Sequence, residues 1–272
     1  MSKALTFELE AQGPFDPRAM SKRDAQAIAR GYYVSEHGYA STPPMLTAPE
    51  SQYKLGKSKR PTFGLSLAAA DMSGYDVCAW RTEACTAVCV LVTAGKGVFP
   101  SVRKARVLKT RFLAEHPQAF VTLVWHELRK AVRARGGIDF RPNVASDIRW
   151  ESVAPALLRV RGVRVYDYTK APAKHREQTA NYRLTFSVSE RPQSTREALE
   201  YLEAGGNAAV VFATIRGHAL PATWHGYDVL DGDLGDSRVD DPAGTVVGLR
   251  AKGDARGTDG SANGFVKEAV AS

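Results

Sequence analysis

The chain has 272 residues, a formal net charge of +8 and 44% hydrophobic residues, a length and composition ample for a buried core. No run of residues approaches the ~20 apolar positions that a membrane-spanning helix needs. The first residues lack the apolar stretch and small-residue cleavage site of a secretory signal. We therefore expect a protein of the cytoplasm that has no membrane partner.

Residues 1–60 are rich in turn-forming residues and poor in periodic pattern. One short helix is predicted over residues 21–30, where Ser21 can cap the first turn and Ala25, Ile28 and Ala29 share a face. We expect this segment to be an extended arm that wraps the main domain.

From residue 61 onward, strand patterns and helix patterns alternate. Helices are predicted over 101–115, 117–135, 148–160 and 194–204, and Pro117 suits the first turn of the second. Strands are predicted at 62–67, 138–141, 163–166, 182–186, 208–212, 226–230 and 245–249.

This alternation is typical of βαβ units and a parallel sheet. With six or seven strands and no glycine-rich dinucleotide fingerprint after the first one, it favours a closed or partial (β/α) barrel over an open doubly wound sheet. We predict a 1–60 arm, a 61–253 barrel-like domain and a 254–272 tail that is rich in Gly, Ala and Ser.

The three cysteines of the chain, Cys78, Cys85 and Cys89, form a C-x6-C-x3-C segment directly after the first predicted strand. An odd number of cysteines cannot all pair within the chain, and clustered thiolates in a reducing compartment are typical of metal sites. Iron–sulfur clusters are held by thiolates in short runs of this kind. Zinc is a competitor, although the segment has no C-x2-C pair and no histidine, and unliganded thiols are the remaining alternative.

The position of the segment adds to this interpretation. In a (β/α) barrel, a loop that follows a strand lies at the carboxyl-terminal face, where active sites form. Polar residues end several of the other predicted strands, and each also suits a helix cap or a turn. We expect six of them to line a substrate site: Asn143, Asp147, Tyr166, Asp167, Lys170 and Ser187.

Positive charge is concentrated in two predicted helices. Residues 103–111 and residues 129–135 each carry several Lys and Arg side chains. Such faces can contact an anionic small molecule or nucleic acid, or a host protein, whereas a solvated outer helix face is the ordinary explanation of a single charged run.

Several motifs together resemble a known family. They are Cys78–Cys85, Ser146–Glu151, Tyr166–Lys170, Asn181–Ser187 and Val247–Gly253. Over residues 61–253 the chain resembles the actinobacterial phage proteins called gene product 88. This resemblance implies a phage origin and expression in the host cytoplasm, and it implies no particular reaction.

A looser similarity is to the radical S-adenosylmethionine enzymes. Those enzymes carry three cysteines after the first strand of a (β/α) barrel, and the cysteines ligate a [4Fe-4S] cluster that has one open iron. Cys78, Cys85 and Cys89 are the matching positions, although the spacing in that superfamily is C-x3-C-x2-C. The resemblance implies S-adenosylmethionine as a cosubstrate.

The sequence therefore leads to two hypotheses. The first is an iron–sulfur enzyme, radical-SAM-like, that modifies a nucleotide or a macromolecule. The second is a non-catalytic iron–sulfur protein for host interaction or redox sensing, which could also bind nucleic acid.

Overall fold

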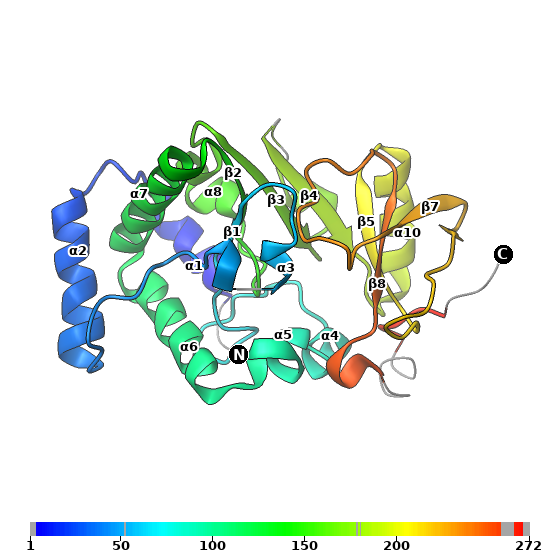
Figure 1. Cartoon of the computed structure of the whole chain (residues 1–272), viewed down its shortest axis with the longest axis horizontal. Coiled ribbons are helices and arrows are strands. Elements are labelled where there is room, and N and C mark those ends of the chain that lie inside the picture. The colour runs from blue at the N-terminus through cyan, green and yellow to red at the C-terminus, as the bar shows by residue number, and fades with distance from the viewer. Residues whose placement is uncertain (1–3, 52, 178, 180, 257–263, 269–272) are drawn as a thin grey trace.

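The computed structural model describes residues 4–51, 53–177, 179, 181–256 and 264–268 (Figure 1). The chain forms a mixed α/β structure around one eight-stranded sheet, in the order β1-β2-β3-β4-β5-β8-β7-β6. The strands are β1 (Thr62–Gly64), β2 (Ile138–Arg141), β3 (Val163–Thr169), β4 (Tyr182–Ser187), β5 (Asn207–Phe212), β6 (Thr223–Trp224), β7 (Tyr227–Asp231) and β8 (Val246–Arg250).

The chain also forms helices of different lengths. The α-helices are α1 (Leu5–Gln12), α2 (Lys22–Arg30), α3 (Tyr53–Gly56), α4 (Glu83–Ala87), α5 (Val90–Thr93), α6 (Pro100–Glu115), α7 (Pro117–Arg135), α8 (Trp150–Val153), α9 (Pro155–Leu158) and α10 (Pro192–Glu203). The π-helix η1 (Gly31–Glu36) and the 3-10 helices η2 (Pro49–Ser51), η3 (Gly95–Val98), η4 (Ala173–His175) and η5 (Gly253–Arg256) complete the set. No helix in the described part of the chain is long and apolar enough to cross a membrane.

Local sequence signals account for the long helices. Ser21 caps α2 by accepting a hydrogen bond from the amide of Asp24, as its position predicts. Pro117 occupies the first turn of α7, and Gly136 ends that helix with a φ of 72°, a left-handed conformation that glycine adopts without strain. The single helix predicted over 148–160 is wrong, because the structure divides it into α8 and α9 at Pro155.

The sheet is parallel from β1 through β5, continues in parallel to β8 and β7, and ends in the antiparallel β6–β7 hairpin. A closed barrel would require its last strand to return to β1. Here β8 lies between β5 and β7, so the final strands extend the sheet away from β1, and the sheet is not closed. The prediction of a mostly parallel α/β sheet is therefore confirmed. Of the two predicted forms of the barrel, the closed one is wrong and the partial one stays a prediction.

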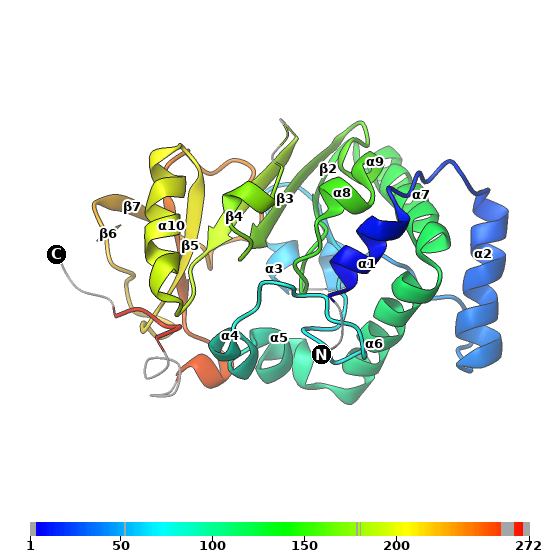
Figure 2. The same cartoon turned by 180° about the vertical axis from the view of Figure 1, so that it is seen from behind.

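Helices cover one face of the sheet, as the view from behind shows (Figure 2). Helix α7 packs on β2, α9 on β3, and α10 on β4 and β5. The opposite face is crossed by the β7–β8 connection, whose Asp236 binds Arg141 of β2 and whose Asp240 binds Arg164 of β3. Side chains alternate along each strand, so the odd-numbered and even-numbered residues of β3 face opposite sides of the sheet.

The first 60 residues contribute to the same hydrophobic core as the sheet. Leu5 and Leu9 of α1 and Ala25 and Ala29 of α2 are buried in the cluster that also contains Phe140. At the other end of the chain, Val266 is buried and Lys267 forms a parallel bridge to Phe212. Part of the predicted tail lies outside the described residues.

Candidate metal centre at the carboxyl edge of the sheet

The cysteine segment runs along the carboxyl ends of the parallel strands. The Cys78 thiol donates to the carbonyl of Ala145, which follows β2, at 3.6 Å. The Thr82 hydroxyl donates to a carboxylate oxygen of Glu190, which follows β4, at 2.8 Å. In Figure 1, α4 and α5 lie below the sheet at this edge. Ligand sites of open parallel sheets lie at this edge.

Two side chains within the segment anchor it to neighbouring loops. The Trp80 ring lies 5.8 Å from the ring of Phe7 in α1 and 6.2 Å from that of His175 in η4, centroid to centroid. The Arg81 guanidinium pairs with Asp71 at 3.0 Å and also with Asp76. The first half of the segment is therefore held from both sides.

The local fold places the other two cysteines on short helices. Cys85 lies in α4, and its amide donates to the Thr82 hydroxyl that caps the helix, at 3.1 Å. Cys89 occupies the position before α5, a helix of four residues. All three cysteine side chains are half-buried.

Burial favours the neutral form of two of the thiols, Cys78 and Cys89. It raises the pKa of Cys78, and the charges of Asp147, Cys85 and Cys89 raise that pKa further, whereas the Ala70 amide lowers it. Burial also raises the pKa of Cys89, opposed by the amides of Leu91 and Val92 and by Arg106. The three sulfurs are thus close enough that the neighbouring cysteines contribute to raising the pKa of Cys78 and of Cys89.

Within the described residues, no group of three or more His, Cys, Asp or Glu side chains is arranged to hold a metal ion. The donor set of three thiols suits a soft metal or an iron–sulfur cluster in its chemistry. Binding would therefore require the thiols to lose their protons and to turn toward a common centre.

Three of the six predicted substrate residues meet in one buried network. The Asn143 backbone amide and side-chain amide donate to the two carboxylate oxygens of Asp167, at 2.9 and 2.8 Å. The Asp147 carboxylate binds Arg176 at 2.8 Å and accepts from the backbone amide of Lys170 at 2.9 Å. Tyr182 completes the network by donating to Asp167 at 2.9 Å. The polar groups of this network therefore form hydrogen bonds with one another.

The Asn143 side chain has no free hydrogen-bonding capacity. Besides Asp167, its amide nitrogen donates to the carbonyl of Ile148 at 2.9 Å. Its oxygen accepts from Ser146 at 2.7 Å and from the indole of Trp150 at 3.2 Å. A substrate could reach Asn143 only by displacing one of these partners.

Arg176 is the residue at the centre of this network that sequence reasoning missed. Its guanidinium also binds Glu151, at 2.6 and 3.2 Å, and donates to the Tyr182 hydroxyl at 2.8 Å. The only sequence signal was an Arg in the charged loop after the third strand. Nothing local indicates that the Arg176 side chain turns inward.

Burial raises the pKa of Asp167 to about 7, against the lowering effects of Arg141, Arg176 and the Asn143 and Tyr182 donors. Three accepted hydrogen bonds stabilise the charged form of this carboxyl, whereas its burial away from solvent destabilises that form. At Asp167, therefore, the loss of hydration favours the protonated carboxyl, whereas its hydrogen bonds favour the charged one.

Tyr166 lies on the opposite face of the sheet from Asp167, since neighbouring residues of a strand alternate. Its hydroxyl donates to Asp236 at 2.6 Å, and Arg141 binds the same carboxylate at 3.0 Å. Tyr166 is fully buried there. The structure does not bring Tyr166 together with Asn143, Asp147 and Asp167.

Lys170 directly follows β3 and Ser187 ends β4, and the two lie side by side at the carboxyl edge. The Lys170 ammonium donates to the Ser187 hydroxyl at 2.9 Å and lies 5.1 Å from the centre of the Phe265 ring. Both residues are half-buried. Of the six predicted substrate residues, these two are the ones that are not buried.

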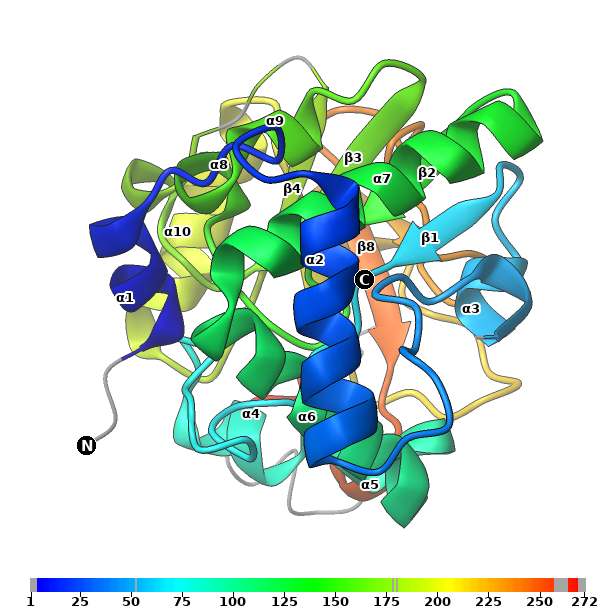
Figure 3. The same cartoon turned by 90° about the vertical axis from the view of Figure 1, so that its left-hand side faces the viewer.

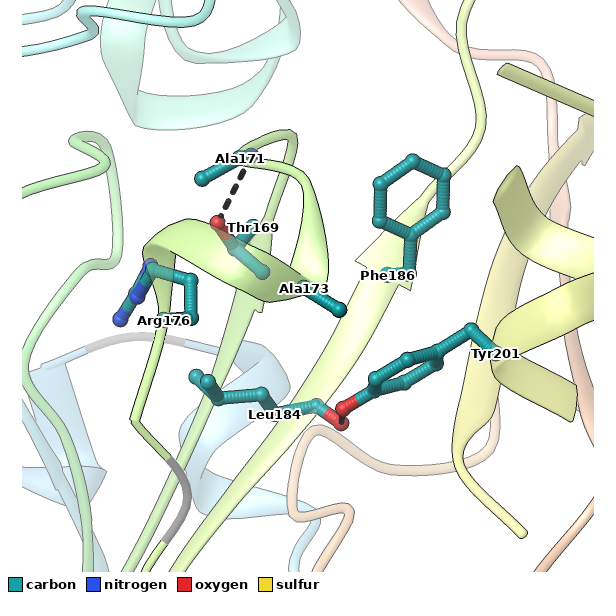
Figure 4. Close-up of a pocket in the computed structure, with 7 residues that line it drawn as sticks. All are labelled: Thr169, Ala171, Ala173, Arg176, Leu184, Phe186 and Tyr201. Carbon is teal, nitrogen blue, oxygen red and sulfur yellow. Dashed lines mark hydrogen bonds between the residues drawn. The ribbon is translucent and has the colours of Figure 1, made fainter. Parts of the chain in front are cut away.

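A small cavity lies behind the sheet, between β3, β4, η4 and α10 (Figure 4). Its volume is about 20 Å³, which is enough for one water molecule and far too small for an organic substrate. Arg176 and Tyr201 are among the residues that line it, and the Thr169 hydroxyl beside it accepts from the amide of Ala171 at 3.0 Å. This cavity is therefore not a substrate site, and the carboxyl edge stays the predicted one on the ground of its place in a parallel sheet.

Comparison with known proteins agrees with the motifs quoted from the sequence. The family model of gene product 88 matches residues 38–268, a longer stretch than the motifs alone cover. No curated protein and no solved structure matches the chain. Because the match extends over most of the chain and includes the cysteine segment and every strand of the sheet, the protein belongs to the gene product 88 family.

Proposed function

We propose that this phage-family protein binds an iron–sulfur cluster, [4Fe-4S] in its simplest form, through Cys78, Cys85 and Cys89. The observation that carries the proposal is the position of all three cysteines on one segment at the carboxyl edge of a parallel sheet. Three thiolates leave one iron of such a cluster free for a substrate or for a ligand other than cysteine.

The arrangement of the segment supports this assignment over a purely structural role. Residues that pack a loop do not need three thiols, and Trp80 and Arg81 already anchor the segment. The amides of Leu91 and Val92 act on the Cys89 sulfur, and such donors stabilise a thiolate ligand. Helices α4 and α5 have five and four residues, so the cysteines can be repositioned at small cost in helical structure.

An enzymatic role follows if the open iron serves a substrate. Lys170 and Ser187 offer a cation and a hydroxyl at the same edge, suited to an anionic substrate such as a nucleotide. S-adenosylmethionine would be the cosubstrate of a radical-SAM-like reaction, and the parallel order of β1 to β5 is compatible with a partial (β/α) barrel. The alternative is a cluster that acts as a redox sensor without catalysis.

The test is anaerobic purification followed by iron and sulfide analysis and a visible absorbance spectrum. We expect a coloured protein with matching iron and sulfide content, and loss of both in Cys78→Ser and Cys89→Ser variants. Thr86→Ser, next to Cys85 in α4, is the matched control and should retain the cluster. A colourless protein that contains only zinc would contradict the proposal.

A second measurement separates the two roles. The reduced, cluster-containing protein is incubated with S-adenosylmethionine, and its cleavage products are quantified. Cleavage that requires the cluster supports the enzyme. A stable cluster with neither binding nor cleavage of S-adenosylmethionine supports the sensor and contradicts the radical-SAM-like reaction.

A further inference from the structure

A stripe of basic side chains runs along the exposed side of α7. His126, Arg129, Lys130 and Arg133 follow the spacing i, i+3, i+4, i+7, which places them on one face of a helix. Arg129, Lys130 and Arg133 are exposed. Helix α2 packs across α7, as Figure 3 shows, and contributes the exposed Lys22 at its first turn. We call Lys22, His126, Arg129, Lys130 and Arg133 the basic face.

The environment of His126 shows that these cations converge. Its pKa is lowered first by burial and then by the charges of Lys22, Arg129 and Arg133. These groups come from both helices, and every charge that acts on His126 is positive. Among the described residues, none of the cations of the basic face forms an ion pair, whereas Arg135, further along α7, binds Glu50 at 2.5 Å.

The other basic helix uses its cations differently. In α6, Arg103 donates to the carbonyls of Gly97 and Val92, and Arg106 donates to that of Leu91. Lys109 donates to the carbonyl of Met45 at 2.7 Å. These cations hold loops in place, whereas the cations of the basic face are left for a partner.

The shape and chemistry of the basic face indicate the kind of partner. Its charges are spread over two helices, which suits an extended polyanion better than a single small anion. Arg129 also stacks on the Trp125 ring at 4.3 Å, which holds its guanidinium in place. None of the large hydrophobic side chains recorded as exposed lies on α2 or α7, so insertion into a membrane surface is not supported.

We propose that the basic face binds the phosphate backbone of a nucleic-acid duplex without reading its sequence. This inference goes beyond the proposed cluster, because the basic face lies at the end of the molecule that carries α2 and α7 and does not involve the cysteine segment (Figure 1). Four cations in contact with phosphates would give a salt dependence of log K against log salt of about −3.6.

The binding test uses the full chain and a DNA duplex of arbitrary sequence, titrated at several salt concentrations. Arg129→Ala/Arg133→Ala should weaken binding and reduce the salt slope by about two, one for each lost contact. The matched control is Arg196→Ala/Arg216→Ala, which removes the same charge from exposed positions in α10 and after β5 and should bind as the unmodified chain does. Equal weakening by both variants, or no binding by the unmodified chain, would overturn the proposal.

His126 provides a readout that is independent of affinity. Its pKa, followed by NMR, should rise when duplex DNA binds, because phosphate offsets the three neighbouring cations. It should already be higher in the Arg129→Ala/Arg133→Ala variant without DNA. An unchanged His126 pKa on saturation with DNA would place the binding surface elsewhere. Tighter binding to phosphatidylserine vesicles than to DNA would identify a membrane partner and contradict the nucleic-acid assignment.

Discussion

Two polar regions meet at the carboxyl edge of the sheet, and they are built in opposite ways. Around Asn143 and Asp167, the polar atoms of a buried network are bound to one another. In the cysteine segment, the thiols are half-buried, burial raises the pKa of Cys78 and of Cys89, and the described residues include no group arranged to hold a metal ion.

The difference indicates how to separate structural from functional polar residues. Side chains at strand ends are candidates for substrate contact, but a buried group whose donors and acceptors are already satisfied stabilises the fold instead. By this criterion the hydrogen bonds of Asn143, Asp147 and Asp167 favour a structural role, and their contact with a substrate stays a prediction. The cysteines, Lys170 and Ser187 are only half-buried, so they stay the candidates for contact with a ligand at the carboxyl edge.

The largest predicted effect is the loss of Arg176. Its side chain is 2% exposed and binds Asp147 and Glu151 together. Arg176→Met would leave buried carboxylates without a partner and should lower the free energy of unfolding by about 3–5 kcal/mol. Chemical denaturation measures this change.

Two controls sharpen this prediction. Arg176→Lys keeps the charge without the planar fork and should lose less stability. Arg196→Met, at an exposed position, should change the free energy of unfolding by less than about 0.5 kcal/mol. A small effect of Arg176→Met would show that the network is not the structural region we describe.

The second prediction concerns pH. The pKa of Asp167 rises from an ordinary value of 3.8 to about 7 in the folded protein, so the folded state binds this proton more tightly than the unfolded state does. The contribution of Asp167 to stability should therefore fall as pH increases from about 4 to about 7.

Urea denaturation at a series of pH values in that window, compared with Asp167→Asn, measures this contribution. The substitution should be destabilising throughout, because Asn143 and Tyr182 lose a carboxylate acceptor, and it should remove the Asp167 part of the pH slope. Identical slopes in the two proteins would contradict the raised pKa.

The smallest predicted effect on the metal-free protein is Cys85→Ser, which should lower the free energy of unfolding by less than about 1 kcal/mol at this half-buried site. After anaerobic reconstitution with iron and sulfide, the unmodified protein should become more stable and the variant should not, since the free energy of ligand binding adds to that of folding. If Cys85→Ser destabilised the metal-free protein as much as Arg176→Met does, the contrast between the two regions would disappear.

Local sequence signals were sufficient for the individual elements. The predicted bounds of β2 and α7 agree with the structure, because alternation, helical periodicity and the stops at Pro117 and Gly136 are properties of neighbouring residues. The placement of the cysteines at the carboxyl edge also followed, since every strand of a parallel sheet points the same way.

Contacts between distant residues were decided only by the tertiary structure. The insertion of β8 between β5 and β7 depends on close approach at Gly248, where a Cβ atom would lie 2.6 Å from the Val229 side chain. The packing of distant segments also turns Arg176 inward toward Glu151. It likewise decides that cations of α6 bind loop carbonyls, whereas those of the basic face on α7 form no ion pair among the described residues. Periodicity predicts which side of an element a residue faces, but the partner on that side comes from elsewhere in the chain. That partner determines whether a polar group is bound within the protein or is available to a ligand.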